Sequence, residues 1–128
     1  MIVPNDRNQL PLLRQTLHQY GESIGIEAHT LKKLEVALEE AVVNIINYSH
    51  ATQIELVISH TGTQSISIQL IDDGIPFDPT NVECDISKAI DERQVGGLGI
   101  SLMHQISDEL HYQRINGNNQ LELIKYLL

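Results

Sequence analysis

Hydrophobic residues in the first part of the chain recur at the spacing of amphipathic helices. Between residues 10 and 24 they stand three or four positions apart, which predicts a helix with one buried face. That face comprises Leu10, Leu13, Leu17, Tyr20 and Ile24. A second helix is predicted from Thr30, a residue type favoured at the N-cap, to about Tyr48. The apolar stub at residues 1–3 is interpreted as the end of a strand.

Further along, apolar and polar residues alternate, as they do in half-buried strands. Residues 54–58 and 66–70 follow this pattern on either side of the turn residues 61–64, so they predict a β-hairpin. Residues 72–99 then show little periodicity and carry several glycines and prolines. Loops of this length in a compact domain are usually functional, which draws attention to the segment.

A third helix and a second hairpin complete the pattern. The helix is predicted over residues 98–110, and two strands at about 110–115 and 120–127 flank the turn-forming residues 116–119. Helices and strands in this order predict an α+β protein in which the helices pack on one face of a single sheet. The chain is short enough to form one domain over residues 1–128.

Composition narrows the class of protein. Hydrophobic residues make up 41% of the chain but aromatic residues only 4%, so the core must be aliphatic. The formal charge of −9 argues against direct nucleic-acid binding, because phosphate contacts need a basic face. A single cysteine, Cys84, leaves no internal disulfide, and no apolar run approaches the roughly 20 residues of a membrane span. We therefore expect a cytoplasmic protein with no membrane contact.

Three polar residues share one stripe of the second predicted helix. Taking each residue to advance about 100°, Asn44 and Asn47 fall within roughly 40° of Glu40 and border the apolar face. Glu39 lies off this stripe, nearer solvent. An amide oxygen one turn from a carboxylate can hold a divalent cation and leave the carboxylate free to accept a proton. Taken alone, such a pair is more often simply a set of polar residues at a helix boundary.

The glycines of the long loop add a second chemical signal. Asp72 ends an apolar strand and Gly74 follows it, so a flat ring could approach the backbone beside a carboxylate acceptor. Gly97, Leu98 and Gly99 stand just before a helix, where backbone N–H groups can face phosphate. Each feature alone is also typical of a turn or a helix cap. The interpretation as a ligand site depends on the order of these features along the chain: the polar helix, then the Asp-x-Gly strand end, then the glycines before a helix.

In that order the sequence resembles the GHKL superfamily of ATP-binding domains. Residues 38–48 (LEEAVVNIINY) are similar to its N box, residues 72–79 (DDGIPFDP) to its first glycine box, and residues 97–100 (GLGI) to its second. The resemblance implies the Bergerat fold, a two-layer sandwich with a mixed, mostly antiparallel sheet of about four to five strands and three main helices on one face. The small size resembles the stand-alone, RsbW-like anti-sigma factors with serine kinase activity.

Carried over position by position, the resemblance implies a set of roles around ATP and Mg²⁺. Glu40 would be the general base, and Asn44 would coordinate the Mg²⁺ that bridges the phosphates. Asp72 would bind the adenine amine, and Gly74 would give the base room. Asn47 belongs to the same box and is counted among the cofactor-binding positions.

The resemblance also implies a lid over the phosphates. Its hinge would be formed at the second glycine box, by Gly97, Leu98 and Gly99. Arg93 is the nearest basic residue for the terminal phosphate, and Lys88 competes with it. On the last strand, Glu122 stands in the region where relatives place a small hydroxyl residue.

Three functions remain open at this stage. The first is an ATP-dependent serine kinase and anti-sigma factor that phosphorylates a STAS-domain antagonist and acts on a sigma factor, as a possible homodimer. The second is a binding module in which ATP selects a protein partner with little or no turnover. The third is a detached histidine kinase catalytic domain, which the lack of a phosphoacceptor helix pair disfavours.

Overall fold

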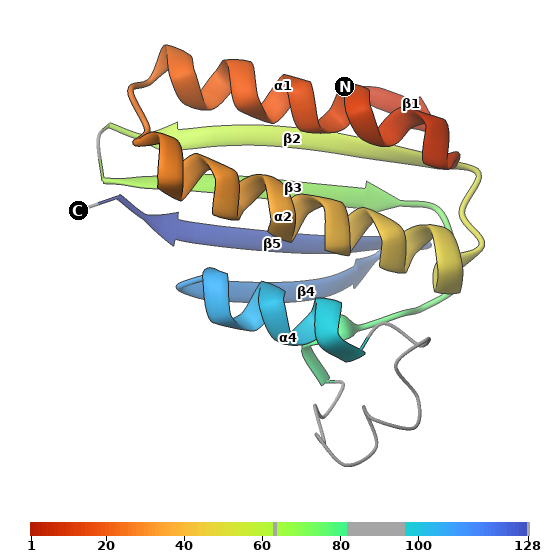
Figure 1. Ribbon diagram of the computed structural model, residues 1–128. Coiled ribbons are helices and arrows are strands. Elements are labelled where there is room, and N and C mark those ends of the chain that lie inside the picture. The colour runs from red at the N-terminus through yellow and green to blue at the C-terminus, as the bar shows by residue number, and fades with distance from the viewer. Residues whose placement is uncertain (63, 82–96, 128) are drawn as a thin grey trace.

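The computed structural model describes residues 1–62, 64–81 and 97–127 (Figure 1). Its strands are β1 (Ile2–Pro4), β2 (Gln53–Thr61), β3 (Ser65–Asp72), β4 (Glu109–Ile115) and β5 (Asn118–Tyr126). Its main helices are α1 (Leu10–Ser23), α2 (Ala28–Asn44) and α4 (Gly97–Ile106). Shorter helical segments are the 3₁₀ turns η1 (Arg7–Gln9) and η3 (Pro79–Asn81) and the π-helix η2 (Ile45–Ser49).

The strands form one sheet in the order β1-β2-β3-β5-β4, and the three main helices cover one of its faces (Figure 1). Both predicted hairpins, β2–β3 and β4–β5, are present. The two-layer α+β architecture is therefore confirmed. The mixed character expected of the sheet is not seen among the described strands, because all four pairings are antiparallel.

The core lies between the helices and the sheet and is aliphatic, as the composition predicted. Strand β3 shows the reason most clearly, because Ile66, Ile68 and Leu70 are buried while the residues between them are only half-buried. From the helices, the largest fully buried side chains are Leu13, Leu17, Leu31, Leu34, Leu38, Val42 and Met103. This packing holds α2, which carries Glu40 and Asn44, over the sheet in which β3 ends at Asp72.

The second helix differs from the prediction at both ends. It begins at Ala28, with Glu27 at the N-cap, so the prediction of Thr30 as the N-cap is wrong. Thr30 lies in the first turn, where its hydroxyl donates to the Glu27 carboxylate (3.1 Å). At the other end, α-helical hydrogen bonding stops at Asn44, and the chain continues as the π-helix η2 instead of as an α-helix to Tyr48.

The third helix is shorter than predicted. It ends at Ile106, where the Ser107 hydroxyl and backbone N–H both donate to the Met103 carbonyl (2.6 and 3.0 Å). Leu110, predicted as its last buried position, belongs to β4 instead. Its apolar side chain still packs against the core, which is why the helical spacing appeared to continue.

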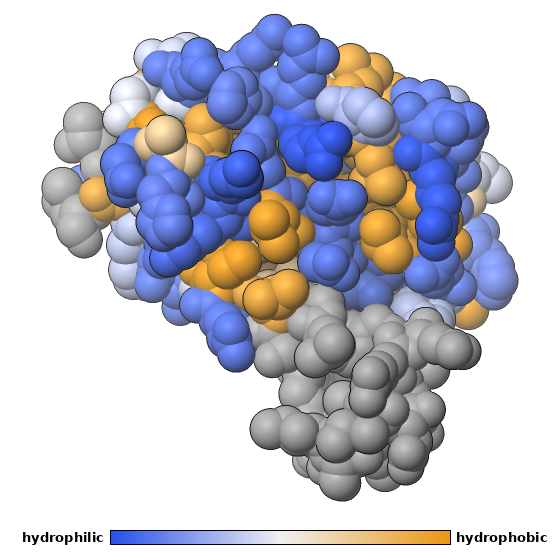
Figure 2. Space-filling model, in the orientation of Figure 1, coloured by the Kyte–Doolittle hydropathy of each residue, from blue (hydrophilic) through white to orange (hydrophobic). Residues whose placement is uncertain are grey.

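The surface over the helices is mostly hydrophilic but carries hydrophobic side chains over α2 and α4 (Figure 2). Val36 and Leu102 are among the exposed large hydrophobic residues. Of the helices in the part of the chain described here, none is long and apolar enough to cross a membrane.

Candidate functional site

The end of α2 presents two of the predicted residues. Asn44 closes the helix and is 2% exposed, whereas Glu40, one turn earlier, is half-buried. The Nδ2 atom of Asn44 is buried and has no hydrogen-bond partner among the described residues. Leaving a buried polar atom unpaired costs about 1–3 kcal/mol, so such an atom calls for a partner beyond the described residues.

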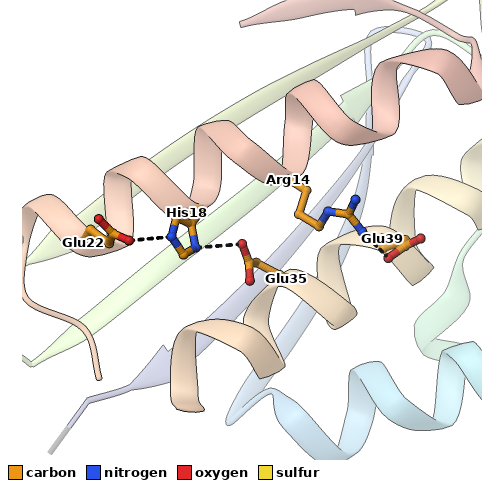
Figure 3. Close-up of polar contacts among 5 residues, drawn as sticks. All are labelled: Arg14, His18, Glu22, Glu35 and Glu39. Atoms are coloured by element: carbon orange, nitrogen blue, oxygen red, sulfur yellow. Dashed lines mark hydrogen bonds and ion pairs between the residues drawn. The ribbon is translucent and has the colours of Figure 1, made fainter. Parts of the chain in front are cut away.

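Glu39 is paired with a residue of α1 (Figure 3). Its carboxylate pairs with the Arg14 guanidinium at 3.3 Å. One turn earlier along α2, Glu35 accepts from His18, whose second ring nitrogen faces Glu22 (3.0 and 2.5 Å). These contacts tie α1 to the outer face of α2. They leave Glu40 as the carboxylate next to Asn44, as the helical arrangement predicted.

Asn47 does not join Glu40 and Asn44. It lies in the π-helix η2, is exposed, and its Oδ1 accepts from the Arg7 guanidinium at 3.4 Å. A π-helix has more residues per turn than an α-helix, so each residue advances by less than 100°. The common stripe predicted for the three residues assumed an unbroken α-helix, and the change of winding rotates Asn47 out of it.

Asp72 is the last residue of β3 and is buried. Its Oδ1 accepts two hydrogen bonds, from the Gly74 N–H (2.9 Å) and from Asn119 Nδ2 (3.0 Å). Among the described residues, every side-chain hydrogen bond to Asp72 reaches this one oxygen. The second oxygen is therefore left as a possible acceptor for a bound molecule.

The described structure gives Gly74 a role in packing. A Cβ at this position would lie 2.7 Å from Ser49 Oγ and from the Ser49 carbonyl carbon. Next to it, the Ile75 N–H donates to the Ser49 carbonyl at 2.7 Å. The glycine thus allows the loop after β3 to touch the end of η2. Room for a base at Gly74 stays a prediction.

Asn44 and Asp72 meet in one small pocket between α2, α4 and the sheet. The other described residues that line it are Ala41, Ile45, Phe77, Pro79, Met103, Tyr112, Asn119 and Leu121. Its free volume is about 10 Å³, room for about one water molecule. Phe77, on its wall, stacks on Tyr48 with ring centroids 5.3 Å apart. A nucleobase can therefore enter only if wall residues such as Phe77 shift.

Asn119 is a site residue that the sequence reasoning missed. It is buried, and its amide bonds to Asp72, to the Ile75 carbonyl and to donors from Phe77, Tyr112 and Arg114. Burial raises the pKa of the neighbouring Tyr112 phenol. Pairing the predicted strands in register would have placed residue 119 beside Asp72, its partner in the β3–β5 ladder.

Glu122, by contrast, lies away from Asp72. It pairs with Gln69 in the ladder, and its carboxylate accepts from the Ser67 hydroxyl at 2.8 Å. The residue that takes the place beside Asp72 is thus Asn119, three residues earlier on the same strand.

The second glycine box is described only in its backbone. Gly97, Leu98 and Gly99 form the first turn of α4, which packs against α2. In Figure 1 this end of α4 lies at the same end of the molecule as the close of α2 and of β3. Arg93, Lys88 and Cys84 lie outside the described residues, so the predicted lid cation stays a prediction.

A nucleotide-bound cation would find few ligands here. Among the described residues, no group of three or more His, Cys, Asp or Glu side chains could hold a metal. Asn44 nevertheless fits the predicted Mg²⁺ role. Its amide is buried and lacks a partner for Nδ2, and the oxygen and nitrogen of a carboxamide can exchange places by a simple flip.

The sequence matches the model of the histidine kinase-like ATPase domain over residues 3–125. It is similar to the serine/threonine-protein kinase BtrW of Bordetella bronchiseptica, with 31% identity over 98 residues, 73% of this chain and 68% of BtrW. It is also similar to the serine-protein kinase RsbW of Bacillus thuringiensis, with 22% identity over 99% of this chain and 83% of that protein.

Solved structures show the same fold at low sequence identity. A chain of the SiaB–SiaC complex of Pseudomonas aeruginosa matches 98% of this chain and 88% of its own length, with a TM-score of 0.70 and 15% identity. A Mycobacterium tuberculosis structure of RsbU and RsbW domains matches 99% of this chain and 32% of its own, with a TM-score of 0.66 and 15% identity.

Proposed function

Because the chain belongs to the histidine kinase-like ATPase domain family and is a GHKL-type kinase, we propose that it transfers the terminal phosphoryl group of ATP to a serine of a protein partner. The partner is a small STAS-domain antagonist, and the protein acts in the cytoplasm as an anti-sigma factor in a partner-switching pathway. The serine kinase names of its relatives support a serine as the phosphoryl acceptor.

The observation that carries the proposal is the meeting of Asn44 and Asp72 in one pocket. The two residues come from different elements and are 28 positions apart, as 72 − 44. Asn44 brings a buried amide whose Nδ2 has no partner among the described residues, and Asp72 brings an acceptor oxygen. A ligand with a metal-bound phosphate at one end and an amino-bearing base at the other would meet both needs.

Glu40 supplies the proton acceptor in this proposal. Phosphoryl transfer asks the protein mainly for positioning and for neutralisation of charge. Mg²⁺, held by Asn44, supplies charge neutralisation at the phosphates when it is bound. Glu40 stands one turn along α2 from Asn44 and accepts the proton of the incoming serine hydroxyl. No ion pair engages its carboxylate within the described part of the chain.

The test has two steps, binding and transfer. Calorimetric titration with ATP should show saturable binding that is stronger in Mg²⁺ than in EDTA. Incubation with labelled ATP and a purified STAS-domain protein should then place phosphate on serine of that protein.

The pair Glu40→Gln and Glu39→Gln provides a matched control, because the two carboxylates are neighbours and only Glu39 is paired with Arg14. We expect Glu40→Gln to bind ATP but to lose transfer, and Glu39→Gln to keep both. Unchanged transfer by Glu40→Gln would exclude this residue as the base. ATP binding without transfer to any partner would favour the ATP-dependent binding module, and phosphorylation on histidine would favour a histidine kinase.

A further inference from the structure

We propose that Asn119 is a positioning residue that holds one oxygen of the Asp72 carboxylate and leaves the other as an acceptor, so that the pocket selects a nucleotide whose base carries an exocyclic amino group over one with an oxo group there. The inference rests on the proposed binding of ATP. Neither the sequence motifs nor the similar proteins give Asn119 a role. In this inference Asn119 determines which nucleobase the pocket prefers.

The hydrogen bonds of Asn119 determine which way its amide faces. Its Nδ2 donates to Asp72 Oδ1 (3.0 Å) and to the Ile75 carbonyl (2.7 Å), and both of these partners are acceptors. Its Oδ1 accepts from the Tyr112 hydroxyl (2.5 Å) and from the Arg114 guanidinium (3.1 Å). A flipped amide would face two acceptors with its oxygen and a guanidinium with its nitrogen, so one orientation is strongly favoured.

This fixed donor orients Asp72. Oδ1 of Asp72 receives two N–H groups, from Asn119 and from Gly74. No described residue bonds to the other oxygen, which as part of a carboxylate accepts hydrogen bonds and donates none. An amino group suits it, whereas an oxo group would bring two acceptors together.

Strand β4 holds Asn119 in place from the other side. Arg114 donates to the Gly74 carbonyl (2.7 Å) as well as to Asn119, so one guanidinium spans the loop after β3 and the start of β5. Tyr112 and Asn119 both line the pocket with Asp72. The carboxylate is thus held by a connected network from β3, β4 and β5, which suits a group that must present one oxygen accurately.

The test compares ATP with inosine triphosphate, which has an oxo group where adenine has its amino group. Asn119→Asp replaces the donor by an acceptor beside Asp72, and Asn118→Asp makes the same change on the neighbouring residue, which is not a pocket residue. Tyr112→Phe removes one donor to Asn119 without changing charge. Dissociation constants for both nucleotides are measured by calorimetry, together with the thermal unfolding of each variant.

We expect the wild type and Asn118→Asp to prefer ATP by at least about tenfold, the value of one hydrogen bond to a charged group. Asn119→Asp should bring the ratio of the two constants close to one, and Tyr112→Phe should lower it in part. A merely structural role would weaken both nucleotides in proportion. An unchanged ratio in variants that fold would therefore overturn the inference.

The outcomes also separate this inference from the proposed function. Selective ATP binding by the wild type, lost in Asn119→Asp, supports the inference even if no partner is ever phosphorylated. Equal binding of both nucleotides by the wild type overturns the inference and leaves phosphoryl transfer as a separate question. Binding of neither nucleotide overturns both.

Discussion

A single methyl group at Gly74 should disrupt the junction between η2 and the loop after β3. The substitution Gly74→Ala places a Cβ 2.7 Å from Ser49 Oγ and from the Ser49 carbonyl carbon. Ser49 is fully buried, and its hydroxyl donates to the Ile45 carbonyl at 2.9 Å. Because the nearest atoms belong to this held residue and include backbone, they cannot yield as the tip of a flexible side chain would.

The expected loss of stability follows from three contributions. Inserting a methyl group into a well-packed site costs about 1–3 kcal/mol. Separating Ile75 from Ser49 would weaken their backbone hydrogen bond, worth about 1 kcal/mol. Replacing glycine by alanine also restricts the unfolded chain, which returns about 0.4–1 kcal/mol. Together they predict a free energy of unfolding lower by about 2 kcal/mol, or a Tm lower by roughly 6–8 °C.

Urea unfolding, followed by circular dichroism, measures this difference, with Gly21→Ala as the control. The three heavy atoms nearest to a Cβ at Gly21 all belong to the Leu31 side chain and include no backbone, and alanine favours a helix by about 1 kcal/mol over glycine. We expect Gly21→Ala to lose about 1 kcal/mol or less. If Gly74→Ala were no less stable than Gly21→Ala, the assignment of this glycine to backbone packing would be wrong.

Three further predictions concern single side chains. The Thr52 hydroxyl and two backbone N–H groups hold the pKa of Asp73 below its ordinary value. The stability that the Asp73 carboxylate contributes is therefore fully present above the unfolded-state pKa, and it is lost as the pH falls through the folded-state pKa. Asp73→Asn should therefore cost up to about 1 kcal/mol in urea at pH 7, discounted for its exposure, and less near pH 3; an equal cost at both would contradict this. Asn44→Ala should weaken ATP binding in Mg²⁺ much more than in EDTA, and equal losses in the two titrations would refute a metal role. Glu39→Gln should lower the free energy of unfolding by no more than about 0.5–1 kcal/mol, since its exposed pair with Arg14 is worth little; a larger loss would show that this pair anchors α1 to α2.

Most of the fold was predictable because its elements follow simple periods. The alternation in β3 predicted which of its residues are buried, and the hairpin turns predicted which strands pair. The errors fall where a local hydrogen bond or a change of secondary structure departs from the spacing of hydrophobic residues. Thr30 bonds to Glu27 inside the first turn of the helix, and Leu110 continues a helical spacing from within a strand.

The candidate site was predictable only in part. Asn44 and Asp72 were found because each carries the chemistry of its motif at the end of a regular element. Asn47 was misplaced because a change from α to π winding leaves no clear signal in the sequence. Asn119 was missed because its importance depends on strand register, which brings together residues 47 positions apart, as 119 − 72.

The π-helix η2 depends on the number of residues between Asn44 and His50. A helix with i→i+5 hydrogen bonds accommodates residues that an α-helix spanning the same distance would have to lose. A deletion of one residue within residues 45–49 could therefore be absorbed as regular α-helix, with Asn44 undisturbed but Ser49 turned away from Gly74. In a relative that lacks one residue at this point, we expect the π-helix to be replaced by regular α-helix. The contact with Ser49 would then no longer require a glycine at the position of Gly74.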